Sequence, residues 1–305
     1  MSGELTKRIA FGVIAAPIAI AILVYGGAPL AALLAVTSAL GAWEFFRMAR
    51  AGGQTPFDDA GIVIAGLIPL AVHARYLRIY DPDTSIGLAS IGALLVLALF
   101  GAAIWRRGVD GKPMSAVAIT LLGAAYVGGM LSFGYAIRNH EYAFAPAQLT
   151  LAGRAFEVPS GGLLLLLPVL LTWASDIGAY AVGRTMGRHK LIPSVSPGKT
   201  VEGSIGGLVA SMLVALVYTK TVLHPAAHLD FRPLPATGVL AFGALVSIAA
   251  QIGDLVESLL KREAGVKDSS HLIPGHGGVL DRCDSLLFVL PISFVLLGVM
   301  LTWAP

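Results

Sequence analysis

Long apolar stretches recur along almost the whole chain, and they limit the possible folds more than any other feature. A membrane-spanning helix needs roughly 20 consecutive apolar residues, and nine stretches come near that length. They are Ile9–Tyr25, Ala28–Met48, Ala60–Tyr80, Ile86–Trp105, Met114–Ile137, Gly162–Gly183, Gly203–Leu223, Thr237–Leu260 and Asp284–Trp303. The third is the least regular, because His73, Arg75 and Arg78 crowd its end. We therefore predict an all-α, polytopic integral membrane protein with about nine transmembrane helices.

Composition excludes other classes of protein. Of the 305 residues, 56% are hydrophobic and 13% are charged, and that charged share is about half the one usual in soluble domains. A soluble fold would leave much of this apolar surface in water, and a disordered chain would be rich in charge. The single cysteine excludes a disulfide framework and a multi-cysteine metal site. The formal net charge of +3 gives no reason to expect a nucleic-acid partner.

Lysine and arginine set the expected orientation, because cytoplasmic loops of membrane proteins are enriched in both. With nine spans and a cytoplasmic N-terminus, 15 of the 21 basic residues fall on the cytoplasmic side and 6 fall outside. The C-terminus is then outside. The first span continues to Tyr25 without an A-x-A cleavage site, so we expect it to be retained. The lack of a long transit segment favours a bacterial cytoplasmic (inner) membrane.

Polar motifs are unevenly distributed along the chain. We divide it into an N-terminal transmembrane bundle of five spans (1–137), an outer loop (138–161) and a region of four spans that holds the motifs (162–305). The outer loop has few charges and no interpretable pattern. No repeat of fixed period is present in the sequence.

Four carboxylates are expected to meet at one depth of the membrane. A carboxylate inside a span costs a few kcal/mol, so Asp176 and Asp254 are functional candidates. Counting about 1.5 Å per residue from the outer ends, Asp176 lies about 21 Å and Asp254 about 26 Å into a core about 30 Å thick. Asp281 and Asp284 begin the ninth span from the cytoplasmic side. The alternative for Asp176 is a packing role, in which it pairs with a neighbouring arginine.

The segment Ser258–Asp284 between the last two spans is the richest in chemical groups. Asp281 and Asp284 are spaced i, i+3 and share a helix face, and with Asp254 they suit a hard divalent cation such as Mg²⁺. Basic side chains suit phosphate oxygens, and glycines allow the backbone to approach a ligand closely. These residues are Lys261, Arg262, Lys267 and Arg282, with Gly275, Gly277 and Gly278. An ordinary cytoplasmic loop with helix-capping aspartates explains the charges but not the glycine–histidine cluster.

A second basic segment lies between the sixth and seventh spans. Its Gly198-Lys199-Thr200 run resembles part of a P-loop, but Pro193 stands where that motif needs glycine, and no strand is predicted ahead of it. We expect a looser phosphate-binding loop in which Ser196, Lys199 and Thr200 are donors. The alternative is a basic loop that contacts anionic lipid head groups.

The segment Ser258–Asp284 resembles the signature of the CDP-diglyceride synthases, also called phosphatidate cytidylyltransferases. The matching residues are Ser258, Leu260, Lys261-Arg262, Lys267-Asp268, Ser270, Ile273-Pro274, His276-Gly277-Gly278, Asp281-Arg282 and Asp284. Cys283 departs from the apolar residue or threonine usual in the family. The region around Asp176 and the Ser196–Gly203 run are also similar to this family. The likeness covers roughly residues 172–284, and the first five spans match only in being hydrophobic.

The resemblance implies a nucleotidyltransferase of phospholipid biosynthesis, which converts CTP and phosphatidic acid into CDP-diacylglycerol and pyrophosphate. It implies an active site that faces the cytoplasm, dependence on Mg²⁺ with a second metal or a monovalent cation left open, and a homodimer. Asp254, Asp281 and Asp284 are then expected as metal ligands, and these three with Lys267 and Asp176 as catalytic residues. The expected substrate and phosphate contacts are Ser196, Lys199, Thr200, Ser258, Lys261, Arg262, His276, Gly277, Gly278 and Arg282. For His276, donation to a phosphate oxygen and shaping of the glycine loop remain equal alternatives.

Two rival classes make different predictions. An ion-coupled transporter would spread its acidic residues along a path and would show a pseudo-repeat, whereas the acidic residues here gather at one side. A CDP-alcohol phosphotransferase would resemble the D-G-x-x-A-R…G-x-x-x-D-x-x-x-D pattern, which this sequence lacks.

Overall fold

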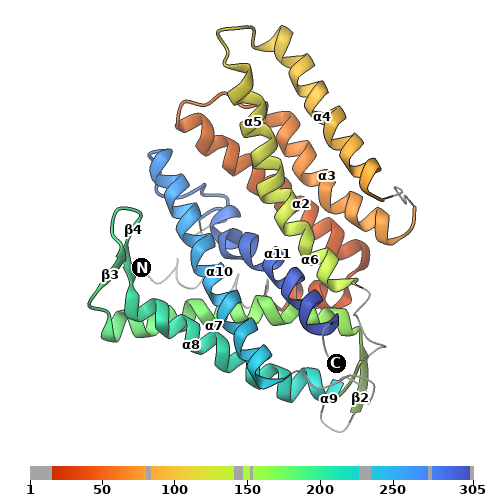
Figure 1. Cartoon of the computed structure of the whole chain (residues 1–305), viewed down its shortest axis with the longest axis vertical. Coiled ribbons are helices and arrows are strands. Elements are labelled where there is room, and N and C mark those ends of the chain that lie inside the picture. The colour runs from red at the N-terminus through yellow and green to blue at the C-terminus, as the bar shows by residue number, and fades with distance from the viewer. Residues whose placement is uncertain are drawn as a thin grey trace. The chain divides into compact units, whose positions relative to one another are not determined.

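The computed structural model describes residues 16–79, 84–140, 147–151, 154–226, 235–273 and 277–302. Long helices dominate these residues (Figure 1). The longer helices are α2 (Gly27–Ala51), α3 (Asp58–Tyr76), α4 (Thr84–Arg106), α5 (Pro113–Ala124), α6 (Met130–Arg138), α7 (Ser160–Met186), α8 (Val201–Tyr218), α10 (Ala236–Glu263) and α11 (Leu280–Thr302). Two π-helical segments, η1 (Ala125–Gly129) and η2 (Thr219–Leu223), continue α5 and α8, and η2 is followed by the short α9 (His224–Ala226).

Strands form only two small antiparallel hairpins in the described ranges. β1 (Ala147–Leu151) pairs with β2 (Arg154–Val158), and both lie in the loop 138–161. β3 (Lys190–Ile192) pairs with β4 (Ser196–Thr200) between α7 and α8. The prediction that no strand precedes Gly198-Lys199-Thr200 is therefore wrong, because these three residues lie in a strand that follows another strand. Pro193 at the turn still rules out a Walker A loop.

Seven helical segments in the described residues are long and apolar enough to cross a membrane, which confirms the prediction of a helical, polytopic membrane protein. They are Gly27–Ala51, Asp58–Tyr76, Pro113–Arg138, Ser160–Met186, Val201–Leu223, Ala236–Glu263 and Leu280–Leu301. Two shorter apolar helices, Ala16–Tyr25 and Ser90–Arg106, coincide with most of the predicted first and fourth spans. Parts of the predicted spans lie outside the described residues, namely 9–15, Tyr80 and Trp303. The count of nine spans stays a prediction.

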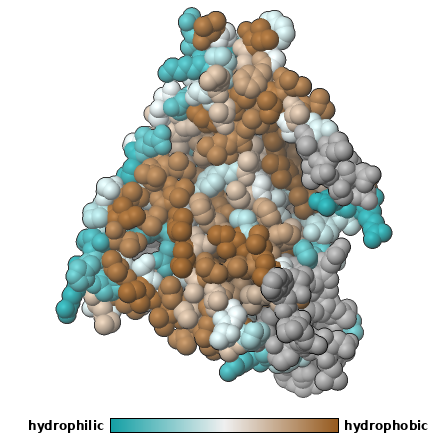
Figure 2. Space-filling view, in the orientation of Figure 1, coloured by the Kyte–Doolittle hydropathy of each residue, from teal (hydrophilic) through white to brown (hydrophobic). Residues whose placement is uncertain are grey.

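Helix α8 illustrates the outward-facing apolar surface that a membrane protein needs. Ile205, Val209, Leu213 and Val217 repeat every four residues and are all about half exposed or more. In a helix this spacing places them on one face. Figure 2 shows hydrophobic residues over much of the visible surface of the molecule. Lipid tails can cover such a surface at no cost, whereas water cannot.

The chain forms two compact units, and both are discontinuous in sequence. The first consists of Met1–Leu30, Phe133–Leu259 and Arg282–Pro305, and the second of Ala31–Ser132 and Leu260–Asp281. The second unit thus joins N-terminal helices to the segment that follows α10. The sequence-based division into 1–137, 138–161 and 162–305 follows chain order and stays a prediction.

In the second unit, α3, α4 and α5 share a small apolar core around Phe57, Leu99 and Val117. Polar contacts fix the turn between α2 and α3. The Phe57 N–H donates to Thr120 Oγ1 at 2.8 Å, and Arg50 pairs with Asp58. The ion pair joins the C-terminal end of α2, which is predicted to face the cytoplasm, to α3. The hydrogen bond joins the start of α3 to α5.

In the first unit, α7 and α8 run side by side in close contact (Figure 1). Small residues make this approach possible. A Cβ atom at Gly207 would lie 2.7 Å from the Ser175 carbonyl oxygen, and one at Gly178 would lie 2.7 Å from that of Gly206. Such distances are too short for a methyl group, so the helix pair requires glycine at these positions. Gly203, four residues before Gly207, faces the same contact, because a Cβ atom there would lie 2.8 Å from the Ala179 carbonyl oxygen.

Candidate active site

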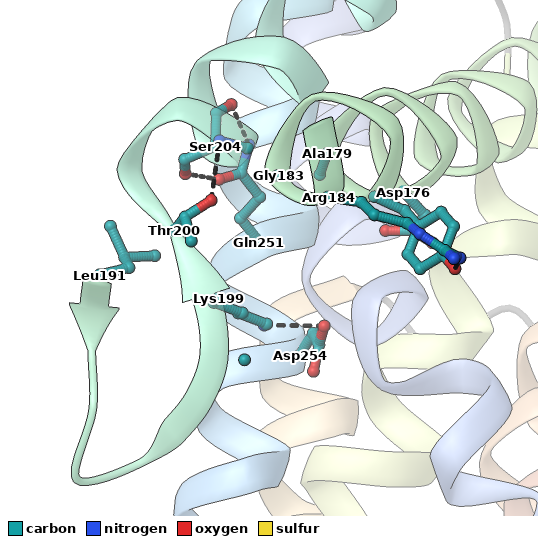
Figure 3. A pocket seen from close by; sticks show the side chains of 13 residues that line it. Asp176, Ala179, Gly183, Arg184, Leu191, Lys199, Thr200, Ser204, Gln251 and Asp254 are labelled. Atoms are coloured by element: carbon teal, nitrogen blue, oxygen red, sulfur yellow. Dashed lines mark hydrogen bonds and ion pairs between the residues drawn. The ribbon is translucent and has the colours of Figure 1, made fainter. Parts of the chain in front are cut away.

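A cavity of about 390 Å³ lies in the first unit, where α7, α8 and α10 meet the β3–β4 hairpin (Figure 3). Its lining combines acidic, basic and hydroxyl side chains with glycines. The lining residues are Asp176, Ala179, Tyr180, Gly183, Arg184, Leu191, Gly198, Lys199, Thr200, Gly203, Ser204, Gln251 and Asp254. A site of this size and polarity can accept the phosphate groups of a nucleotide.

The hairpin that carries Lys199 is fixed at its base. Lys190 pairs with Thr200 across the two strands. Thr200 then caps α8, because its Oγ1 accepts the Gly203 N–H at 3.1 Å. Glu202, in the first turn of α8, accepts the backbone N–H of Arg188 at 3.0 Å and lies 2.6 Å from His189 Nδ1. The strand therefore enters the helix in a defined direction, with Lys199 directed into the cavity (Figure 3).

Lys199 and Asp254 form an ion pair within the cavity. The Lys199 ammonium nitrogen lies 2.7 Å from Asp254 Oδ2, and the two side chains are 25% and 39% exposed. Ser258, one turn further along α10, lies 3.5 Å from Asp254 Oδ1, which is too far for a strong hydrogen bond. Lys199, predicted to bind phosphate, thus pairs with Asp254, which is predicted to bind the metal and belongs to α10.

Three of the four predicted acidic residues interact in this unit. Asp176 interacts electrostatically with Asp254 and Asp284, and also with the cations Lys199 and Arg282. Asp176 comes from α7, Asp254 from α10 and Asp284 from the start of α11. Asp176, Asp254 and Asp284 are therefore close enough to interact electrostatically, whereas the meeting of all four carboxylates at one depth stays a prediction.

A chain of neutral polar groups joins the three helices beside the cavity. The Gln251 amide nitrogen donates to the Ser204 carbonyl oxygen at 3.1 Å and to Ser247 Oγ at 3.0 Å, and its oxygen accepts from Ser204 Oγ. Ser247 Oγ in turn lies 2.7 Å from Ser175 Oγ. The amide group of Gln251 is thus committed to α8 and α10, and its role in the site is to hold these helices together.

Asp281 lies in the second unit, in the first turn of α11. Its Oδ1 lies 2.7 Å from the Lys261 ammonium nitrogen, and both side chains are largely buried. Its Oδ2 accepts hydrogen bonds from the Ser269 N–H, the Ser269 hydroxyl and the Gly278 N–H, at 3.1, 2.7 and 2.8 Å. The helix start at Leu280 agrees with the prediction that Asp281 and Asp284 share the first turns of one helix.

The remaining predicted site residues fall into three groups. Lys267, Arg262 and Arg282 are exposed, and Ser196 is partly buried on β4. Gly277 adopts a left-handed φ of +78°, and Gly278 is buried. His276 lies outside the described residues, as do Pro274 and Gly275.

The donor atoms of a site decide whether it can hold Mg²⁺. Among the residues that the structure describes, no group of three or more His, Cys, Asp or Glu side chains is arranged to hold a metal ion. Mg²⁺, however, is usually bound by one or two carboxylates together with substrate phosphates and water. Asp254, which lines the cavity, and Asp284, which interacts with Asp176 in the cavity wall, fit that requirement in their chemistry.

Sequence reasoning missed two residues that organise the site. Gln251 and Glu44 both lie in stretches that count simply as apolar spans. Glu44 is completely buried, and its carboxylate accepts hydrogen bonds from the Ser269 and Ser270 hydroxyls. A carboxylate in a span was the available signal for Glu44. For Gln251, the helical spacing of four residues from Ser247 was the only hint.

A helical membrane fold with lysine, arginine and carboxylate side chains around one cavity defines a polytopic membrane enzyme for phosphate-bearing substrates. Comparison with known proteins makes this specific. Residues 6–300 match the Cytidylyltransferase family, and the chain belongs to that family.

Curated relatives cover most of the chain. A phosphatidate cytidylyltransferase of Synechocystis sp. is 35% identical over 300 residues, which is 95% of this chain and 95% of the relative. One of Bacillus subtilis is 30% identical over 97% of this chain and 98% of its own length. One of Staphylococcus haemolyticus is 42% identical over 69% of this chain and 78% of its own length. The resemblance to phosphatidate cytidylyltransferases extends well beyond residues 172–284 and includes the first five predicted spans.

Proposed function

We propose that this enzyme transfers CMP from CTP to phosphatidic acid, and so produces CDP-diacylglycerol and pyrophosphate for phospholipid biosynthesis. The observation that carries the proposal is the cavity in which Lys199 meets Asp254, in a chain similar over most of its length to phosphatidate cytidylyltransferases. The apolar helices that surround the site suit a substrate that stays in the membrane.

The proposed reaction is a direct displacement. A phosphate oxygen of phosphatidic acid attacks the α-phosphorus of CTP, the bond to the β-phosphate breaks, and pyrophosphate leaves with the electron pair. Because the attacking group is already an anion near neutral pH, the barrier is mainly charge repulsion and alignment. Lys199 and Arg184 would bind phosphate oxygens inside the cavity, and Asp176 would orient these cations. Lys261, Arg262, Lys267 and Arg282 are proposed as further phosphate contacts.

We also propose dependence on Mg²⁺, with Asp254, Asp281 and Asp284 as candidate ligands. A bound divalent cation would neutralise charge on the triphosphate and on the departing pyrophosphate. The role of Asp254 and Asp284 as metal ligands is supported by their carboxylate groups, both of which interact electrostatically with Asp176. For Asp281, the ion pair with Lys261 must be exchanged for a bond to the metal.

The proposed setting is a bacterial cytoplasmic membrane with the active site facing the cytoplasm. We further propose that the chain has nine spans, with the N-terminus in the cytoplasm and the C-terminus outside, and that it forms a homodimer. The distribution of lysine and arginine supports the orientation, and bacterial relatives support the compartment.

The test uses the full chain purified in detergent with phosphatidic acid and α-labelled CTP. We expect CDP-diacylglycerol in the presence of Mg²⁺, no product with EDTA, and recovery when Mg²⁺ is restored. Asp254→Asn, Asp281→Asn and Asp284→Asn should each raise the Mg²⁺ concentration needed for half-maximal rate. The control is Thr185→Val, because Thr185 is an exposed residue of α7 whose hydroxyl, among the described residues, donates within its own helix.

Each result has a distinct meaning. If folded protein gives no product with any of several phosphatidic acids, the proposed reaction is wrong. If product forms equally with EDTA, the metal proposal is wrong while the reaction stands. If Asp281→Asn alone keeps the wild-type Mg²⁺ dependence, Asp281 is removed from the ligand set.

A further inference from the structure

We propose that Glu44 of α2 is a positioning residue, whose carboxylate holds both ends of the segment 269–280 and thereby fixes the first turn of α11. Glu44 lies in the N-terminal helices, where nothing in the reaction chemistry calls for an acidic group. The inference rests on the proposed function only for its rate measurement, and its second measurement is independent of activity.

The Glu44 carboxylate is fully buried and fully hydrogen-bonded. Its exposed fraction is 0%. Oε1 accepts from the Ser270 hydroxyl at 2.5 Å and the Val279 N–H at 2.9 Å. Oε2 accepts from the Ser269 hydroxyl at 3.0 Å and the Leu280 N–H at 2.6 Å. A buried carboxylate is costly unless donors surround it, and here four neutral donor groups do so, of which the Ser269 hydroxyl is shared with Asp281.

Two of these donors belong to the start of a helix. Val279 and Leu280 stand at the N-terminus of α11, where backbone N–H groups have no acceptor within the helix. A side chain from α2 accepts both, and its negative charge is favoured at this end of the helix dipole. Glu44 therefore caps α11 from a distant part of the sequence.

One of the other two donors, the Ser269 hydroxyl, links Glu44 to Asp281. The Ser269 hydroxyl lies 3.0 Å from a Glu44 oxygen and 2.7 Å from an Asp281 oxygen. A hydroxyl carries one proton, so it can donate to only one of them at a time and couples the two carboxylates. The Ser269 N–H also donates to Asp281, at 3.1 Å. If Glu44 moved, Ser269 would shift with it, and Asp281 and the start of α11 would shift in turn.

Gly278 supports the same conclusion. A Cβ atom there would lie 2.5 and 2.6 Å from the two Glu44 oxygens. Any larger residue would push the carboxylate away or move the loop. In the described residues, this glycine permits a close approach to the Ser269 hydroxyl, which would be nearest to an added Cβ, and to the Glu44 carboxylate.

The experiment compares Glu44→Gln with wild-type full-length protein in detergent. Glutamine has nearly the same shape, but its NH₂ group must face either the Val279 or the Leu280 N–H, so one of the two capping hydrogen bonds is lost. We expect kcat to fall about a hundredfold, the size typical of a small misplacement of reacting groups, while KM for CTP changes less than about threefold. Ser38→Ala is the matched control, because Ser38 is a buried residue of the same helix whose hydroxyl has no hydrogen-bond partner among the described residues.

A second measurement follows the order of α11 directly. Cys283 is the single cysteine of the chain and lies in the first turns of α11, partly buried. We expect Glu44→Gln to raise its rate of reaction with a maleimide severalfold at a temperature where the variant is folded, and Ser38→Ala to leave the rate unchanged. This measurement stands even if the wild-type protein makes no CDP-diacylglycerol, in which case only the proposed function fails.

A double-mutant cycle tests the route through Ser269. Because Glu44 is proposed to act on Asp281 through this hydroxyl, Glu44→Gln with Ser269→Ala should lower kcat little more than Glu44→Gln alone. If the two substitutions lower kcat independently, so that their factors multiply in the double variant, the proposal is wrong. It is also wrong if Glu44→Gln keeps both the wild-type kcat and the wild-type reactivity of Cys283. If Glu44→Gln does not fold, Glu44→Asp and Ser270→Ala replace it. A wild-type kcat in both would equally overturn the proposal.

Discussion

The Lys199 ammonium nitrogen lies 2.7 Å from an Asp254 carboxylate oxygen, and this ion pair joins the β3–β4 hairpin to α10 inside the cavity. Both side chains remain partly exposed. Ion pairs between partly exposed side chains contribute only about 0–1 kcal/mol to folding. The pair therefore holds two charges in place for a ligand more than it stabilises the fold.

Lys199 is expected to serve phosphate binding. Replacement by methionine keeps most of the side-chain volume but removes the charge, so KM for CTP should rise at least tenfold and kcat should fall at least tenfold. Thermal unfolding should change little. Steady-state rates with α-labelled CTP check this, and Lys199→Arg should recover part of the activity. Unchanged kinetics in Lys199→Met would remove this lysine from the site.

The amide of Gln251 is expected to stabilise the packing of α8 and α10. Gln251→Leu leaves the Ser204 carbonyl and the Ser247 hydroxyl without their amide partner. The cost of about 1–3 kcal/mol corresponds to a melting temperature lower by roughly 2–12 °C. Thermal unfolding in detergent measures it, with Thr185→Val as a control for a hydrogen bond inside one helix. Equal melting temperatures for Gln251→Leu and wild type would contradict the prediction.

The glycines between α7 and α8 are expected to be intolerant of even a methyl group. In Gly207→Ala the new Cβ meets the Ser175 carbonyl oxygen, so overpacking should cost about 1–3 kcal/mol. Because Asp176 follows Ser175, the rate of CDP-diacylglycerol formation should also fall. Gly101→Ala is the matched control, since a Cβ at Gly101 of α4 has no described atom within 4 Å. It should be neutral or slightly stabilising, and a loss of stability as large as that of Gly207→Ala would refute the packing explanation.

The proposed topology places the two termini on opposite sides of the membrane. In a Cys283→Ser background, Pro305→Cys should react with a membrane-impermeant maleimide in intact cells, and Ser2→Cys should react only after permeabilisation. An odd number of spans requires this difference. Equal labelling of both positions in intact cells would mean an even number of spans.

Features that depend on local spacing were predictable from the sequence. The apolar stretches predict the helices, and the i, i+3 spacing of Asp281 and Asp284 correctly places both at the start of one helix. Depth counting predicts that Asp176 and Asp254 approach each other, because rise per residue is a property of the helix alone.

Features that depend on distant partners were not predictable. Nothing in the residues around Glu44 indicates that its carboxylate oxygens accept hydrogen bonds from Ser269, Ser270 and the start of α11. The β3–β4 hairpin was missed because Pro193 and the polar residues beside it are typical of an irregular loop. Gln251 went unnoticed because a single amide hardly changes the hydropathy of a span.

The contact between Glu44 and Ser269 also sets an order of events during synthesis. The two residues are 225 positions apart, so at about 5–20 residues per second the ribosome needs roughly 10–45 s between them. Throughout that interval the helix around Glu44 exists without its hydrogen-bond donors. The N-terminal helices therefore cannot reach their final state as they emerge, and they mature only when the last part of the chain arrives.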